Sequence, residues 1–177
     1  MGIRQIQARY DELQDRVLLR VSTGEDTEFA FWFTRRFMKR LWSLLLKTLE
    51  QDDPVRQQSD REARKAVLAM RHEGFVQQSD FSHPFEEKRY QRPLGAEPML
   101  VARADYKPGE KPDAFTLSLR RRDGRGVDLG LNAALLHSIC KLLADAVAQS
   151  DWNLKLDMPS AMFPPTVDEP AAPRTLQ

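Results

Sequence analysis

The sequence predicts an α+β protein built of two pseudo-symmetric βββα units with antiparallel sheets. In residues 17–49, apolar side chains alternate through two strands and then recur at helical spacing, and residues 115–147 repeat the pattern. The two stretches match without a gap when one is shifted by 98 residues, so that Asp15 meets Asp113. A three-stranded sheet with one helix cannot bury enough apolar surface alone, so we expect the units to share one core.

The first unit is expected over residues 3–50. An extended segment comes first, and the next strand places three apolar residues on one face: Val17, Leu19 and Val21. The return strand of the hairpin places three aromatic residues on the same face: Phe29, Phe31 and Phe33. Thr34 is expected to cap a helix that ends near Glu50, because its hydroxyl can accept from a free backbone N–H.

Residues 51–97 are expected to link the two units. A helix beginning at Ser59 or Asp60 should bury a stripe formed by Ala63, Ala66, Val67, Met70 and Phe75. Residues 79–97 show no period, and three prolines occur between Ser79 and Pro98. Their aromatic and leucine side chains are too apolar for a free linker, so we expect this segment to lie across the surface of the domain.

The second unit is expected over residues 98–150. A strand over residues 99–106 precedes a hairpin whose Asp123-Gly124 turn is typical of type I′. Asn132 should cap the second helix. The leading strands of the two units correspond around Ala8 and Ala102, which implies a loop four residues longer in the second unit. We expect a short strand at 152–156 that completes a single domain over residues 1–157, followed by a disordered proline-rich tail at 158–177.

The outer faces of the two sheets differ, and this difference is the best clue to an interface. The first unit places Leu18, Ala30 and Trp32 outward, whereas the second unit places Thr116, Asp128 and Gly130 at the matching positions. An apolar outer face should be covered, since large exposed apolar patches are uncommon on monomers. Either the helix over 59–78 packs on it, or the three residues form an interface with a partner or a second copy.

Two clusters of basic residues suggest contact with the phosphates of a nucleic acid. The first lies at the start of the first helix and contains Arg35, Arg36, Lys39 and Arg40. The second surrounds the hairpin turn and contains Arg120, Arg121, Arg122 and Arg125. The formal net charge of +1 argues against a general polyanion binder, so a solvated turn and helix face is the competing interpretation.

No constellation for catalysis, cofactor binding or metal binding emerges from the sequence. The three histidines match no metal-ligand spacing, and the single cysteine, Cys140, is expected to be a buried thiol. A single cysteine also fits a reducing cytoplasm. No apolar run approaches the length that spans a bilayer, so we expect no membrane partner.

The sequence therefore favours a non-enzymatic cytoplasmic protein that interacts with or scaffolds an unknown protein partner, with homodimerisation as one form of that interaction. Nucleic-acid binding through the two arginine clusters is the alternative, and it ranks second. We expect no cofactor in either case.

Overall fold

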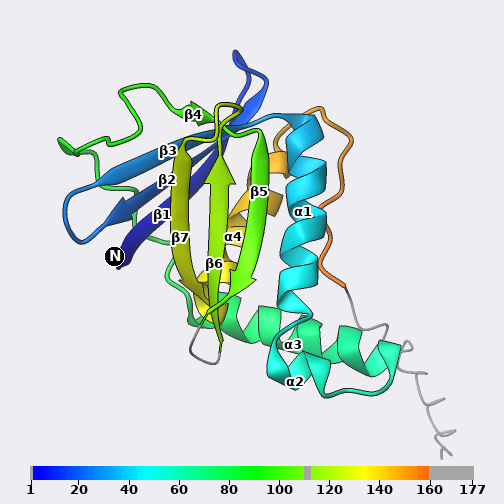
Figure 1. Cartoon of the computed structure of the whole chain (residues 1–177). Helices are drawn as coiled ribbons and strands as arrows, with labels where there is room; N and C mark the ends of the chain where they lie inside the picture. Colours follow the sequence, from blue (N-terminus) through cyan, green and yellow to red (C-terminus); the bar gives the residue numbers. More distant parts are fainter. Residues whose placement is uncertain (1, 110–112, 160–177) are drawn as a thin grey trace, which may run out of the picture.

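The fold is α+β, as predicted, with two separate sheets (Figure 1). The computed structural model describes residues 2–109 and 113–159; the predicted tail lies almost wholly outside them. Sheet 1 contains, in spatial order, β1 (Ile3–Asp11), β2 (Arg16–Thr23), β3 (Glu28–Phe33) and β4 (Met99–Leu100). Sheet 2 contains β5 (Arg103–Pro108), β6 (Ala114–Arg120) and β7 (Gly126–Asn132). All pairs are antiparallel except the parallel pair β3–β4.

A long helix follows each hairpin, and the same kind of cap begins both. The helices are α1 (Arg35–Leu49), α2 (Asp53–Arg56), α3 (Arg61–Gln78) and α4 (Ala133–Ala148). The Thr34 hydroxyl accepts from the Phe37 N–H at the start of α1, and the Asn132 side chain accepts from the Leu135 N–H at the start of α4. Each cap satisfies a backbone donor that the first turn leaves free, and both predicted caps are confirmed.

The 98-residue shift also relates the strand registers of the two units. Val17 pairs with Phe33 in sheet 1, and Phe115 pairs with Leu131 in sheet 2. Asp15 and Asp113 precede the second strands and both have a positive φ, 48° and 61°. Descent of the two units from a duplicated segment stays a prediction, because a shared topology does not test ancestry.

The leading strands keep the same shift, which corrects the predicted loop length. Ala8 pairs with Leu19 in sheet 1, and Tyr106 pairs with Leu117 in sheet 2. The counterpart of Ala8 is therefore Tyr106 rather than Ala102. The chain between the paired strands is equally long in both units, so the prediction of a longer loop in the second unit was wrong. Apolar and polar residues alternate only weakly in both leading strands, so the sequence did not determine their register.

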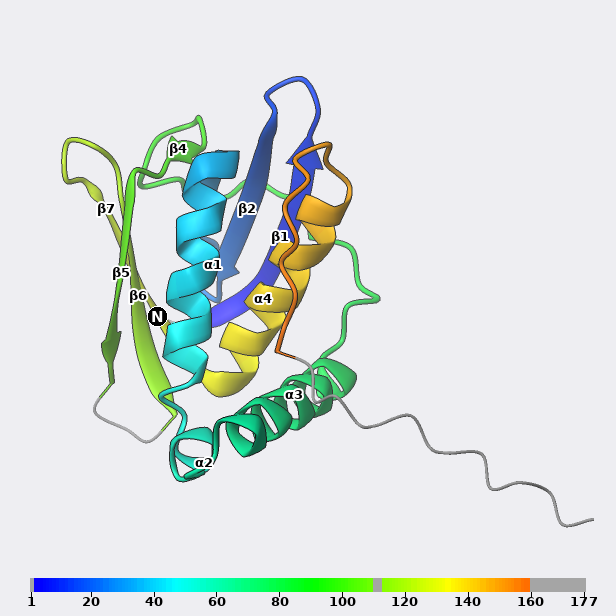
Figure 2. The same cartoon turned by 90° about the vertical axis from the view of Figure 1, so that its right-hand side faces the viewer.

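The two units exchange their helices, and this exchange joins them into one core. Helix α1 follows sheet 1 in the chain but packs beside β5 of sheet 2, whereas α4 follows sheet 2 but packs on β1 and β2 (Figure 2). Buried side chains from both sheets and both helices form one continuous cluster. Phe31, Phe33 and Phe37 stack in sequence within it, with ring centroids 6.4 and 5.5 Å apart.

Three local predictions were wrong. Helix α3 forms where expected, but it buries Leu68 and leaves Met70 exposed, and it packs on α2 and α4 instead of sheet 1. Residues 152–156 form no strand, although the Trp152 and Leu156 side chains are buried.

The predicted strand over 99–106 breaks after Leu100, because the chain there crosses from β3 to β6. The Val101 N–H bonds to Trp32, and the Ala102 N–H bonds to Arg120.

The hairpin turn of sheet 2 is not of type I′. Among the turn residues 121–125, all of which are described, Gly124 alone has a positive φ, at 86°. A type I′ turn needs positive φ at both central residues. The Gly124 N–H donates to the Arg121 carbonyl at 3.0 Å, which leaves Arg122 and Asp123 as ordinary central residues. Among the turn residues, a positive φ therefore favours glycine at position 124 alone.

Gly126→Ala is expected to lower the free energy of unfolding by about 2 kcal/mol. A methyl group at Gly126 would overlap the carbonyl oxygen of Leu119 on the paired strand, where backbone cannot easily move. Chemical denaturation of both proteins measures the change. Gly130→Ala is the matched control in the same strand, because nothing lies within 4 Å of the added methyl group. Equal stability of the two variants would contradict the prediction.

Candidate functional site

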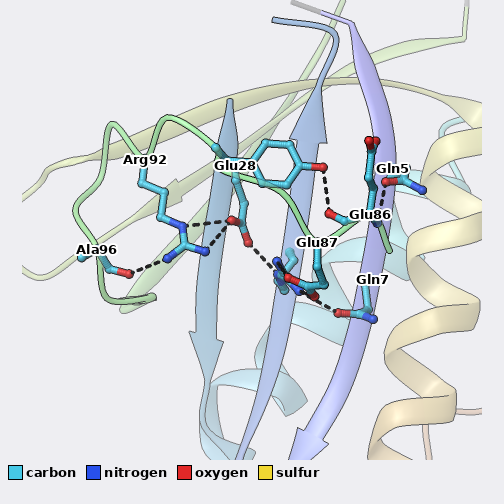
Figure 3. Close-up of polar contacts among 9 residues, drawn as sticks. Gln5, Gln7, Glu28, Glu86, Glu87, Arg92 and Ala96 are labelled. Atoms are coloured by element: carbon cyan, nitrogen blue, oxygen red, sulfur yellow. Dashed lines mark hydrogen bonds and ion pairs between the residues drawn. The ribbon is translucent and has the colours of Figure 1, made fainter. Parts of the chain in front are cut away.

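Residues 80–98, here called the cover segment, lie across the outer face of sheet 1 (Figure 3). The Gln91 backbone bonds to both Asp26 and Glu28, and the side chain of Gln5 on β1 bonds to the backbone of Pro84 and Glu86. Phe85 is buried beneath the segment, with the Arg20 guanidinium 4.1 Å from its ring centroid. The expectation that this segment lies across the surface is confirmed.

Ion pairs around a buried carboxylate hold the cover segment in place (Figure 3). Glu28 is 1% exposed and accepts from Arg20 Nε at 2.6 Å and from Arg92 Nε at 2.9 Å. Arg20 also contacts Glu87 of the cover segment, and this hydrogen bond lowers the pKa of Glu87. The network spans sheet and cover, so neither element keeps its charged groups satisfied without the other.

The cover segment occupies the face on which the sequence predicts an interface. Leu18 is buried, at 5% exposed, while Ala30 and Trp32 are half-buried. These three residues do lie on one face, since Leu18 pairs with Trp32 and Arg20 with Ala30. The cover segment contacts this face at Arg20 and Glu28, while Ala30 and Trp32 keep part of their surface exposed.

The two basic clusters lie at the same end of the molecule, around the β6–β7 turn and the start of α1 (Figure 1). Arg35, Arg36, Lys39 and Arg40 are exposed, and they line a shallow depression together with Leu154. At the turn, Arg121 and Arg125 both contact Asp123, and Arg122 is exposed. The backbone N–H of Arg125, together with these guanidinium groups, lowers the pKa of the Asp123 carboxyl. Arg120 differs from its neighbours: it is half-buried and bonds to Asp128 and the Val127 carbonyl.

A groove of about 770 Å³ separates the turn from the end of the cover segment. Its basic wall contains Arg121, Arg122 and Arg125, and its other wall runs from Pro93 to Ala102. Thr34, the cap of α1, also lines it, so the groove reaches the residue that precedes the helix cluster. Both clusters could be identified in the sequence. The groove could not, because its second wall is a loop whose sequence has no periodic pattern.

Sequence reasoning also missed a contact between two histidines. His72 on α3 and His137 on α4 face each other with their Nδ1 atoms 3.1 Å apart, and Phe75 stacks on His137 with ring centroids 5.0 Å apart. His137 is fully buried, and burial lowers its pKa to about 3. Burial likewise lowers the pKa of His72. The pair is neutral at pH 7, and it joins two helices through residues that are 65 positions apart in the chain.

Other ionisable groups lie in structural positions. Cys140 is buried, as predicted, and burial raises the pKa of its thiol to about 12. Asp52 is also buried; desolvation and the neighbouring Asp113 carboxyl raise its pKa, while contact with Arg71 opposes that rise. Within residues 2–109 and 113–159, no group of three or more metal-ligating side chains converges.

No family model, curated protein or solved structure matches this chain. In the described part of the chain, every helix is too short or too polar to cross a bilayer. The candidate site therefore rests on the geometry and charge of its own residues.

Proposed function

We propose that this protein acts by binding rather than by catalysis, and that it binds nucleic acid through phosphate contacts at its basic end. The site consists of the exposed cations of the α1 cluster and of the β6–β7 turn. Arginine and lysine on a helix and a hairpin are the groups that hold a phosphate backbone in register. The single observation that carries the proposal is the convergence of the two clusters on one end of the fold.

The distribution of charge supports this proposal although the net charge is only +1. Several basic groups elsewhere in the molecule lie beside carboxylates, as in the pairs Arg20–Glu28, Arg71–Asp52 and Lys88–Asp26. At the basic end, Arg121 and Arg125 share Asp123 within the turn, Arg122 is exposed beside them, and the α1 cluster adds four exposed cations. A local excess of positive charge attracts a polyanion even when the whole chain is nearly neutral.

The sequence ranked a protein partner or a homodimer first, and the geometry favours the other candidate. Of the residues assigned to that interface, Leu18 is buried, and Ala30 and Trp32 are half-buried, on the sheet face that the chain's own cover segment crosses. At the basic end, every arginine of the two clusters except Arg120 is exposed. The cytoplasmic location expected from the single cysteine accords with a nucleic-acid ligand and is part of the proposal.

Fluorescence anisotropy with labelled oligonucleotides, single-stranded and duplex, tests the proposal over a series of salt concentrations. We expect binding that weakens as salt rises, since counterions are released at each contacted phosphate. The triple variant Arg36→Ala/Lys39→Ala/Arg40→Ala should weaken binding at least tenfold at low salt. It should also flatten the slope of log K against log salt by about 0.9 per lost contact on a duplex, or about 0.7 on a single strand.

The control is Arg61→Ala/Arg64→Ala, which removes two exposed arginines from α3 near the opposite end of α1. This double variant should bind like the parent protein. An equal loss in both variants would mean that any surface arginine suffices, and an absence of binding to either oligonucleotide would refute the proposed function.

A further inference from the structure

We propose that the nucleic acid bound at the basic end is single-stranded, and that the groove beside the β6–β7 turn takes one or more of its unstacked bases. This inference rests on the proposed function and specifies its ligand. It is carried by the chemistry of the groove, whose two walls differ in kind. One wall is cationic, and the other is mainly apolar, with Glu97 as its one charged side chain.

The apolar wall does not favour the binding of phosphate. It includes Pro93, Leu94, Pro98 and Leu100, and Leu100 is 42% exposed. Phosphate oxygens held against these side chains would lose water and gain no hydrogen bond. A base has an apolar face and polar edges, so it can bury Leu100 while its edges reach the backbone groups of the loop.

The cationic wall serves both parts of a nucleotide. A guanidinium group is planar and can stack on a base, and its N–H groups can also donate to phosphate oxygens. Arg121 and Arg125 are oriented by Asp123, at 2.9 and 3.2 Å, while Arg122 extends from the turn as an exposed side chain. The groove is therefore suited to a base with its phosphate beside it.

From the groove, the rest of the nucleic acid strand can run along the α1 cluster. Thr34 lines the groove, and the α1 cluster begins at the next residue. Arg36, Lys39 and Arg40 follow at spacings of three and four residues, which place their side chains on one face of α1. A single strand can leave the groove and follow this face. In a duplex the bases are stacked and paired, so only the sugar–phosphate backbone would meet the groove.

Anisotropy measurements at one salt concentration compare a 20-nucleotide dT strand, a duplex, and a dT strand in which alternate bases are replaced by abasic sites. We expect the dT strand to bind at least tenfold more tightly than the duplex. The abasic strand keeps every phosphate, and it should bind several-fold more weakly than intact dT. A duplex that binds as tightly as dT would overturn this inference and leave the proposed function standing.

The variant Leu100→Lys separates base contact from charge. It adds a cation to the groove and removes the apolar wall, so phosphate contact alone would strengthen binding. We expect its affinity for dT to fall about three- to tenfold, with duplex affinity unchanged or higher. Thermal unfolding checks that the half-exposed position tolerates the change. A rise in dT affinity would overturn the inference, as would tighter binding of polyglutamate than of either nucleic acid, since the groove would then take an acidic protein segment.

Discussion

Replacing Arg20 with leucine is expected to lower the free energy of unfolding by about 3 kcal/mol. The change leaves Glu28, which is 1% exposed, without its closest cation. A buried carboxylate that loses its partner keeps the cost of desolvation and loses the attraction that offset it. Arg92 still contacts Glu28, which holds the loss near the lower end of the usual range for such pairs. Urea denaturation of the two proteins at pH 7 measures the difference.

Two further variants show whether the loss comes from the stranded carboxylate. Arg20→Leu/Glu28→Leu removes both charges and should recover most of the stability, because apolar replacements of a buried pair are often close to neutral. Arg4→Ala removes an exposed ion pair with Glu86 on the same cover segment, and exposed pairs contribute at most about 1 kcal/mol. If the double variant is as unstable as Arg20→Leu, loss of packing beneath Phe85 would be the cause instead.

The elements of the two units could be predicted because their signals are local. Phe29, Phe31 and Phe33 alternate in sequence, and the hydroxyl of Thr34 lies next to the helix that it caps. Strand period, turn residues and caps all depend on neighbours within a few positions. The 98-residue shift then placed the second unit before any contact between the units was known.

The arrangement of these elements could not be predicted, because it depends on contacts between distant residues. Helix α3 contains apolar residues on several faces, and contact with α4 decides that Leu68 is buried while Met70 is exposed. The cover segment has no periodic pattern, and its place on sheet 1 is decided by ion pairs such as Arg92–Glu28 over 64 residues. Opposite charges so far apart have many candidate partners in a sequence with 30% charged residues.

The candidate site, too, could be predicted from the sequence only in part. Both arginine clusters are visible in the sequence, since each is a short run of basic residues. Their convergence follows from the fold: the β6–β7 turn and the start of α1 come to one end because α1 packs beside β5. The groove between the turn and residues 93–102 depends on the crossing of the chain at Val101 and Ala102, which no local pattern signals.

The stability of the protein is expected to fall steeply in acid because of His137. Its pKa is about 3 in the folded protein and about 6.5 for an unperturbed histidine. The unfolded chain therefore binds a proton below about pH 6.5 that the folded chain excludes, so this contribution to stability is complete above that pH and is lost as the pH falls toward 3. Each pH unit in that window corresponds to about 1.4 kcal/mol, or about 3 kcal/mol between pH 7 and pH 4.

The surroundings of His137 explain why the proton is excluded. The ring is fully buried, its Nδ1 faces His72 on α3, and Phe75 covers one of its faces. The charges nearby are also positive: Arg71 on α3 disfavours protonation of His137, and Lys141 on α4 disfavours protonation of His72. A proton on His137 would thus be desolvated and repelled, so the folded chain accepts it only at a much lower pH than the unfolded chain.

His137→Phe tests this account, because phenylalanine can stack on Phe75 without titrating. Urea denaturation of both proteins at pH 7, 5.5 and 4 gives two curves that share every carboxylate of the chain. Their difference should change by about 3 kcal/mol across this range in favour of the variant at low pH. Parallel curves would show that His137 is protonated as easily in the folded chain as in the unfolded one, which its burial between α3 and α4 does not allow.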